Sequence, residues 1–142
     1  MNFLRSIKKE DTKSLVRGIE TLHTVVSFSL IYFFVWRSQY SDGIFPDYYY
    51  NGKYVLMGVY GLLALLLIKS MDGFLYGDLN VFDLIMAQGI GLFATNTITY
   101  FQLCLIANHI ISVVPILWLF CLEIIISFIY VLIFVYINQI LL

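Results

Sequence analysis

Glu123 is the side chain in this sequence with the clearest capacity for chemistry. It is the only charged residue between Leu84 and Leu142, in a stretch made almost wholly of apolar residues. An ionisable group inside a membrane-spanning helix is costly and often serves transport or proton transfer. The plainer and favoured interpretation is a carboxyl group that is neutral, or hydrogen-bonded to Asn96, Thr95 or His23, and that joins helices. Glu123, Asn96 and His23 are therefore our candidate intramembrane polar site.

The remaining polar residues predict no catalytic, cofactor-binding or metal site in this chain. His23 and His109 have no histidine or cysteine neighbour at metal-ligand spacing. Asp72 and Asp78 lie in a segment with two glycines, which is more typical of a turn than of a cation site. The sequence contains no phosphate-binding glycine loop and no nucleophile motif.

The composition places these residues in a membrane protein. The 142 residues are 61% hydrophobic and 12% charged, whereas soluble domains carry about 25% charged residues. A soluble protein of this length could not cover so much apolar surface, so lipid must be the solvent. The charges are also segregated, since five of the eight basic residues precede Gly18. This distribution excludes a nucleic-acid-binding face.

The hydrophobic pattern predicts an all-α bundle of four transmembrane helices. Residues 1–17 form a basic juxtamembrane segment, lying against anionic headgroups or solvated, and residues 18–142 form the transmembrane domain. The last 59 residues from Leu84 would make about 88 Å of helix, against a bilayer core of about 30 Å, so they must fold back at Asn108-His109. The predicted spans are Gly18 to Trp36, Tyr54 to Ile68, Val81 to Ala107 and Ile110 to Leu142.

Two details follow for the fourth span. Pro115 is expected to kink or cap its start, and Asn138-Gln139 to mark its exit from the membrane. Glu123 would lie about 22 Å from the turn at Asn108, toward the cytoplasmic side.

Basic residues predict the orientation of the bundle. With the N-terminus inside, the inner side has six Lys and Arg residues, and the outer side has only Arg37 and Lys53. Both termini should then be cytoplasmic. The outer loop between those two residues contains Tyr48-Tyr49-Tyr50, which suits a membrane–water interface.

Small residues predict how the helices pack. Along the third span they recur every four residues and form one ridge that allows close approach of helix backbones: Ala87, Gly91, Thr95 and Thr99, with Asp83 in the first turn. Gly58 and Gly61 are expected to do the same in the second span.

Four stretches resemble the N-terminal membrane region of bacterial polyprenyl-phosphate sugar-phosphate transferases, which initiate exopolysaccharide and O-antigen synthesis. They are the basic lead, the Tyr-rich loop, GFLYGDLNVFDLIMAQ from Gly73 to Gln88, and NTITYFQ from Asn96 to Gln102. The resemblance implies a multi-pass protein of the bacterial inner membrane. In that family a cytoplasmic catalytic domain follows the four-helix region and uses magnesium. This chain contains no counterpart of that domain, so no catalytic residue is transferred.

The leading hypothesis is thus a membrane-anchoring and assembly domain of such a transferase, not catalytic by itself. Its expected partners are the lipid bilayer, a catalytic domain in cis or trans, polyprenyl phosphate and a second copy of the chain. The alternative is a small four-helix carrier or flippase-like subunit that uses Glu123 as a coupled group.

Overall fold

The computed structural model describes residues 2–37 and 52–141, and these form four helices. They are α1 (Asn2–Val35), α3 (Gly52–Ser70), α4 (Val81–Ala107) and α5 (Val114–Leu141). The predicted all-α helical bundle is confirmed. Three helices, α1, α4 and α5, are long and apolar enough to cross a membrane, whereas the apolar part of α3, Tyr54–Ser70, is shorter. The predicted interface role of Tyr48–Tyr50 lies outside the described residues.

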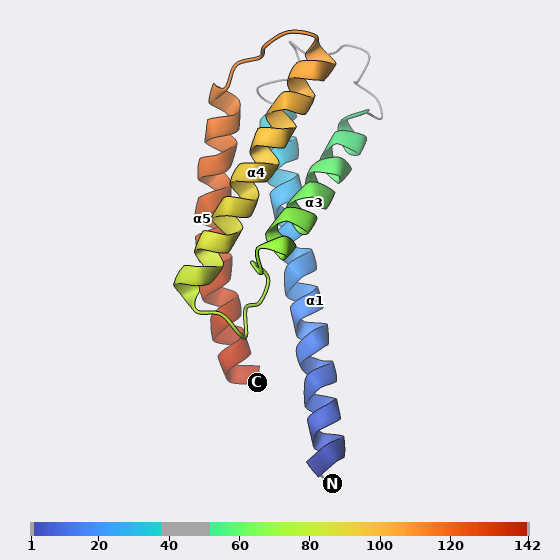
Figure 1. Cartoon of the computed structure of the whole chain (residues 1–142), viewed down its shortest axis with the longest axis vertical. Coiled ribbons are helices and arrows are strands. Elements are labelled where there is room, and N and C mark those ends of the chain that lie inside the picture. Colours follow the sequence, from blue (N-terminus) through green and yellow to red (C-terminus); the bar gives the residue numbers. More distant parts are fainter. Residues whose placement is uncertain (1, 38–51, 142) are drawn as a thin grey trace.

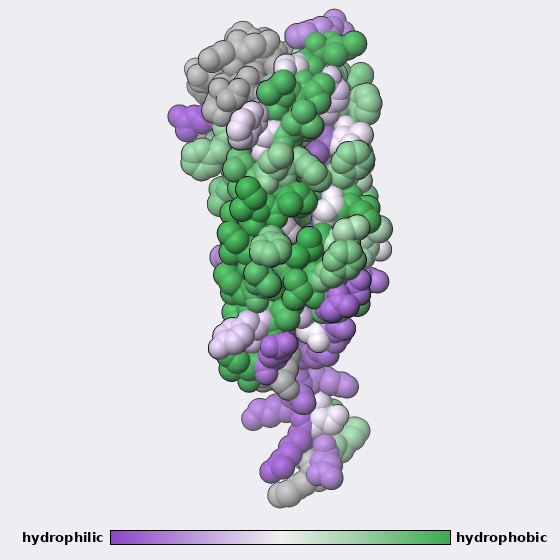
Figure 2. All heavy atoms as spheres, turned by 90° about the vertical axis from the view of Figure 1, so that its left-hand side faces the viewer, coloured by the Kyte–Doolittle hydropathy of each residue, from purple (hydrophilic) through white to green (hydrophobic). Residues whose placement is uncertain are grey.

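The helices are arranged so that each one packs against two others. Contacts join α1 to α3, α3 to α4, α4 to α5 and α5 to α1. Figure 1 shows this up-and-down bundle, with the N-terminal and C-terminal ends of the chain at the same end. Large apolar side chains are exposed on all four helices, and Figure 2 shows a broad hydrophobic band across the middle of one face of the molecule. Such a surface is suited to lipid rather than to water.

Helix α1 begins much earlier than the predicted first span. It runs without interruption from Asn2 through Gly18, over 34 residues or about 51 Å. The predicted boundary at Gly18 is therefore not a helix break. One exposed glycine costs about 1 kcal/mol in a helix, and the segment before it contains no proline. The basic first part of α1 extends beyond the bundle as a hydrophilic arm (Figures 1 and 2).

Helix α4 has the predicted bounds because an asparagine ends it on each side. The side chain of Asn80 accepts a hydrogen bond from the Asp83 backbone N–H at 2.8 Å, which caps the first turn. Asp83 lies in that turn, as expected for a negative charge at a helix N-terminus. At the other end Asn108 adopts a left-handed conformation with φ of 59°, and its N–H binds the carbonyl of Leu105.

Helix α5 begins at Val114, so the prediction of a start at Ile110 is wrong. Pro115 occupies the first turn, where its missing N–H has no helical partner to lose. The helix therefore follows a short connection, and its 28 residues are fewer than predicted. Glu123 consequently lies about 14 Å from the start of α5, compared with about 20 Å for a start at Ile110.

The loop from Met71 to Asn80 folds back under the bundle. Asp72 is left-handed with φ of 62°, and the N–H of Gly73 binds the carbonyl of Ile68 at 3.0 Å. A Cβ at Gly73 would lie 2.5 Å from Ile68 Cγ2, so this close return requires glycine. It buries Phe74 and Tyr76 between the helices.

Candidate intramembrane polar site

The centre of the bundle contains three polar side chains from three helices. Tyr60 of α3, Asn96 of α4 and Glu123 of α5 are 1%, 3% and 0% exposed, and we call them the central triad. They meet because they lie at similar depths. Tyr60 is eight residues from the start of α3, Asn96 eleven from the end of α4 and Glu123 nine from the start of α5, or about 12–17 Å from one end of the bundle.

Tyr60 links the other two members of the triad. Its hydroxyl donates to Asn96 Oδ1 at 2.8 Å and is also hydrogen-bonded to Glu123 Oε1. A phenol has one hydrogen, so it cannot donate to both oxygens at once. With the Asn96 amide oriented in this way, both bonds form when Glu123 is protonated and donates to Tyr60. A neutral carboxyl also avoids placing a bare charge in an apolar interior.

The triad also retains hydrogen-bonding capacity. Asn96 Nδ2 and Glu123 Oε2 are buried and have no hydrogen-bond partner among the described residues. The ring of Tyr32 stacks on that of Tyr60 with centroids 4.3 Å apart, so the α1 side of the triad is covered by an aromatic face. The triad can thus hold a proton on the Glu123 carboxyl group. It also offers one further donor group, the Asn96 amide nitrogen, and one further acceptor, Glu123 Oε2.

A second group of buried polar side chains lies nearer the 71–80 loop, and we call it the loop-side network. Gln88 of α4 donates to Tyr76 Oη at 2.7 Å and to the carbonyl of Gly73 at 2.8 Å, and it accepts from Ser127 of α5. Tyr76 is 2.9 Å from Thr24 Oγ1 of α1. Since the Thr24 hydroxyl already donates to a backbone carbonyl, Tyr76 must be the donor.

Tyr76 must be protonated to donate a hydrogen bond to Thr24. Burial raises the pKa of Tyr76 to about 12, so the phenol keeps its hydrogen at neutral pH. The network therefore joins α1, α4, α5 and the loop through satisfied hydrogen bonds.

Two further polar contacts join α1 to its neighbours. Asn138 of α5 donates to both carboxylate oxygens of Glu20, at 2.8 and 3.1 Å. In the loop, Asp78 accepts from Lys13 Nζ and Arg17 Nη2, each at 2.7 Å. The hydrogen bond from Lys13, together with that from Arg17, holds the pKa of Asp78 below its ordinary value.

The structure unites only part of the predicted polar site. Glu123 and Asn96 lie together, with Tyr60 between them. His23 does not join them, because its exposed ring packs against Tyr130, with centroids 5.2 Å apart. Tyr130 follows Glu123 by seven residues, about 10 Å further along α5. The proposed partnership of His23 with Glu123 is therefore wrong.

The predicted packing residues differ in what they contact. A Cβ on Gly91 would lie 2.9 Å from the Ile68 Cα, and one on Gly61 would lie 2.4 Å from Ser29 Oγ, so both glycines stand at close helix crossings. Ala87 and Thr95 are buried on the same side of α4 as Gly91. Gly58 differs, because a Cβ there would meet no atom within 4 Å. Its predicted packing role is not fulfilled within the described residues.

Our sequence reasoning missed Tyr60, Gln88, Ser127 and the pair of Glu20 with Asn138. A signal was present in α5, where Ser127 and Asn138 follow Glu123 by four and fifteen residues and so share its helix face. Nothing comparable marks Tyr60, which is one of 11 tyrosines in the chain.

Comparisons with known proteins identify no relative. No family model matches the sequence, and no curated protein and no solved structure matches it. Across residues 2–37 and 52–141, no group of three or more His, Cys, Asp or Glu side chains could hold a metal ion. The described geometry therefore defines a helical membrane bundle with internally bonded polar groups.

Proposed function

We propose that this chain is a membrane-anchoring and assembly domain that is not catalytic by itself. The observation that carries the proposal is the bonding of buried polar side chains to one another across helices. The central triad joins α3, α4 and α5, the loop-side network adds α1, and Glu20 binds Asn138. Interhelical hydrogen bonds of this kind fix one arrangement of a bundle, as an anchor requires.

The proposed partner is the cytoplasmic catalytic domain of a polyprenyl-phosphate sugar-phosphate transferase. This follows from the sequence resemblance and from the predicted orientation in a bacterial inner membrane. The basic arm of α1, the 71–80 loop and the end of α5 lie at one end of the bundle (Figure 1). With that end cytoplasmic, the arm carries its lysines and arginines at the membrane surface where such a domain would work.

A reconstitution experiment tests this function. Liposomes containing the chain, polyprenyl phosphate and magnesium are incubated with labelled nucleotide sugars. We expect no product above liposomes that lack protein, because phosphoryl transfer needs cations or metal ligands placed around the phosphates. A soluble catalytic domain of this transferase class is then added, and we expect it to bind these liposomes and to form product. Turnover by the chain alone, or no recruitment of the domain, would contradict the proposal.

The carrier function is a second candidate because Glu123 Oε2 and Asn96 Nδ2 are buried without partners. A transported proton or polar substrate could use these two atoms. Proton flux into liposomes distinguishes the candidates. A carrier predicts flux that Glu123→Gln abolishes while the bundle stays folded, and an anchor predicts the same background leak for both proteins.

A further inference from the structure

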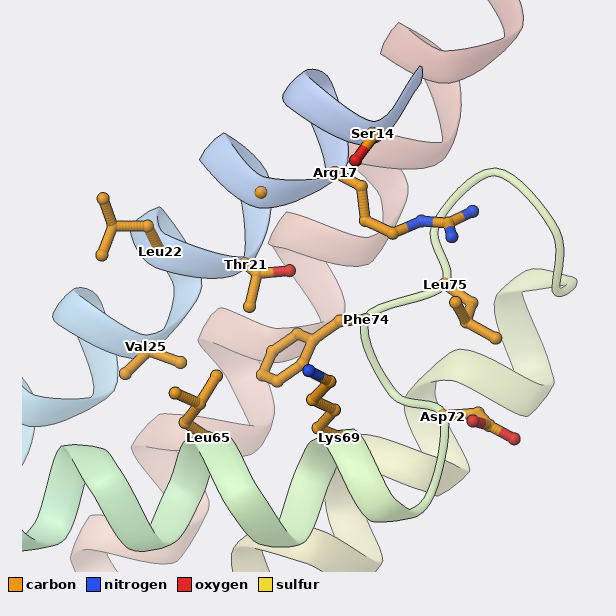
Figure 3. A pocket seen from close by; sticks show the side chains of 11 residues that line it. Ser14, Arg17, Thr21, Leu22, Val25, Leu65, Lys69, Asp72, Phe74 and Leu75 are labelled. Atoms are coloured by element: carbon orange, nitrogen blue, oxygen red, sulfur yellow. The ribbon is translucent and has the colours of Figure 1, made fainter. Parts of the chain in front are cut away.

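A cleft of about 510 Å³ lies between α1, α3 and the 71–80 loop, away from the central triad. Its volume lies in the range of about 300–1,000 Å³ that is usual for ligand sites. Figure 3 shows Val25 of α1, Leu65 of α3 and Phe74 of the loop facing one another across it. Leu22 of α1 also lines the cleft and is 65% exposed, so the apolar wall continues onto the outer surface of the bundle.

Two cations border this apolar space. Figure 3 shows the Lys69 ammonium directed toward Phe74, whereas the Asp72 carboxylate is turned away from that ring. Lys69 forms no ion pair within the described part of the chain. Arg17 bonds to Asp78 through Nη2, which leaves other guanidinium N–H groups to donate.

We propose that this cleft binds one anionic phospholipid of the surrounding leaflet. Lys69 and Arg17 hold the phosphodiester, and an acyl chain lies along Leu22, Val25 and Leu65. Charge complementarity favours this ligand over a dianionic phosphate monoester. The charged residues that line the cleft are Arg17, Lys69 and Asp72, so a single positive charge remains to match a phosphodiester. The proposal rests on the placement of this chain in a lipid membrane, and it does not depend on any catalytic partner.

A larger side chain at Gly18 would fill the cleft and leave its charged residues, Arg17 and Lys69, unchanged. It lines the cleft, and a Cβ added there meets no atom within 4 Å, so a larger side chain enters the cleft rather than the bundle. Gly58 is a matched control because a Cβ there is equally unobstructed and Gly58 does not line the cleft. For the charge, Lys69→Gln is matched by Lys8→Gln, on an exposed lysine of the α1 arm.

The test is native mass spectrometry of the full chain from a mild detergent that contains equal amounts of phosphatidylglycerol and phosphatidylcholine with identical acyl chains. We expect one phosphatidylglycerol molecule to be retained in preference to phosphatidylcholine. Lys69→Gln should reduce that preference about fivefold, the effect of one basic residue near a lipid surface. Gly18→Leu should abolish retention, and Gly58→Leu and Lys8→Gln should leave it unchanged. Circular dichroism confirms that each variant is folded.

Several outcomes would overturn the proposal. Equal retention of the two lipids, or unchanged retention in folded Gly18→Leu and Lys69→Gln, would show that the cleft does not select an anionic lipid. Equal losses in the cleft variants and their controls would point to a general effect of composition or charge. A third arm supplies polyprenyl phosphate in the same amount. If that lipid displaces phosphatidylglycerol from the wild type and is itself retained less by the cleft variants, the site selects a phosphate monoester and the proposed ligand is wrong.

Discussion

Gly91→Ala should destabilise the bundle more than the same change at Gly18, Gly58, Gly61 or Gly89. An added Cβ would lie 2.6 Å from Ile68 Cγ1 and 2.9 Å from Ile68 Cα. Carbon atoms pack best at about 3.5–4.0 Å, so α3 and α4 must separate by about 1 Å or bend. Because one of the opposing atoms belongs to the backbone, no rotamer change relieves the contact. Overpacking of this kind typically costs about 1–3 kcal/mol.

Two other glycines make the prediction a graded series. At Gly61 the nearest atom is Ser29 Oγ, the end of a side chain that can rotate, so we expect Gly61→Ala to cost less than Gly91→Ala. Gly58→Ala meets no atom and gains up to about 1 kcal/mol of helix propensity, so it should be neutral or stabilising. Thermal unfolding in a mild detergent, followed by circular dichroism, gives the order. If Gly91→Ala melts at or above the temperature of Gly58→Ala, the inferred close crossing of α3 and α4 is wrong.

Three further predictions concern the triad, the loop and the topology. Glu123→Gln should remain folded because an amide can also donate a hydrogen bond to Tyr60. Glu123→Lys places an unpaired cation in the core and should abolish the monodisperse peak in size-exclusion chromatography. Equal behaviour of the two variants in this assay would contradict a neutral carboxyl group at Glu123. Because its partners lower the pKa of Asp78, this residue should stabilise the bundle above its unfolded pKa of about 4, and this stability should disappear as the pH falls through the lower folded value. At pH 7 the free energy of unfolding of Asp78→Asn should therefore be lower than that of the wild type, by at most about 1 kcal/mol, the value of an exposed ion pair. At a pH below both pKa values the two proteins should be equally stable. A stability difference that stays constant across this pH range would refute the ion-pair explanation. With both termini cytoplasmic, a thiol reagent outside the cell should label Ile44→Cys and not Met71→Cys in a variant without native cysteines, and the reverse pattern would invert the model.

The helix bounds that could be predicted are those fixed by local polar residues. Asn80 and Asn108 end α4 because their side chains and backbones satisfy helix termini, and the sequence displays both of them. The start of α5 was missed because residues 110–113 are as apolar as a helix interior, so hydropathy does not distinguish them. Proline at the first turn was the better guide.

The site could be predicted only in part for a different physical reason. Hydropathy and helical rise give the depth of a residue, but not the direction in which its side chain points around the bundle. His23 was joined to Glu123 on the basis of its polarity, although its ring faces Tyr130 instead. The later start of α5 also mattered, because it shortens the helical distance from the first residue of the helix to Glu123 from about 20 Å to about 14 Å.

The polar face of α5 explains how the arrangement of the helices is made specific. Leucine and isoleucine side chains alone would let a helix shift along its axis at little cost, since lipid and the protein surface are equally apolar. Glu123, Ser127 and Asn138 cannot, because each bonds to a different partner: Tyr60, Gln88 and Glu20. A slip of α5 by one turn, about 5.4 Å, would break all three bonds together and leave buried groups unpaired. Helix α5 therefore has a single vertical register against its neighbours. The 71–80 loop, which borders the proposed lipid-binding cleft, is held in that register through Tyr76 and Gln88.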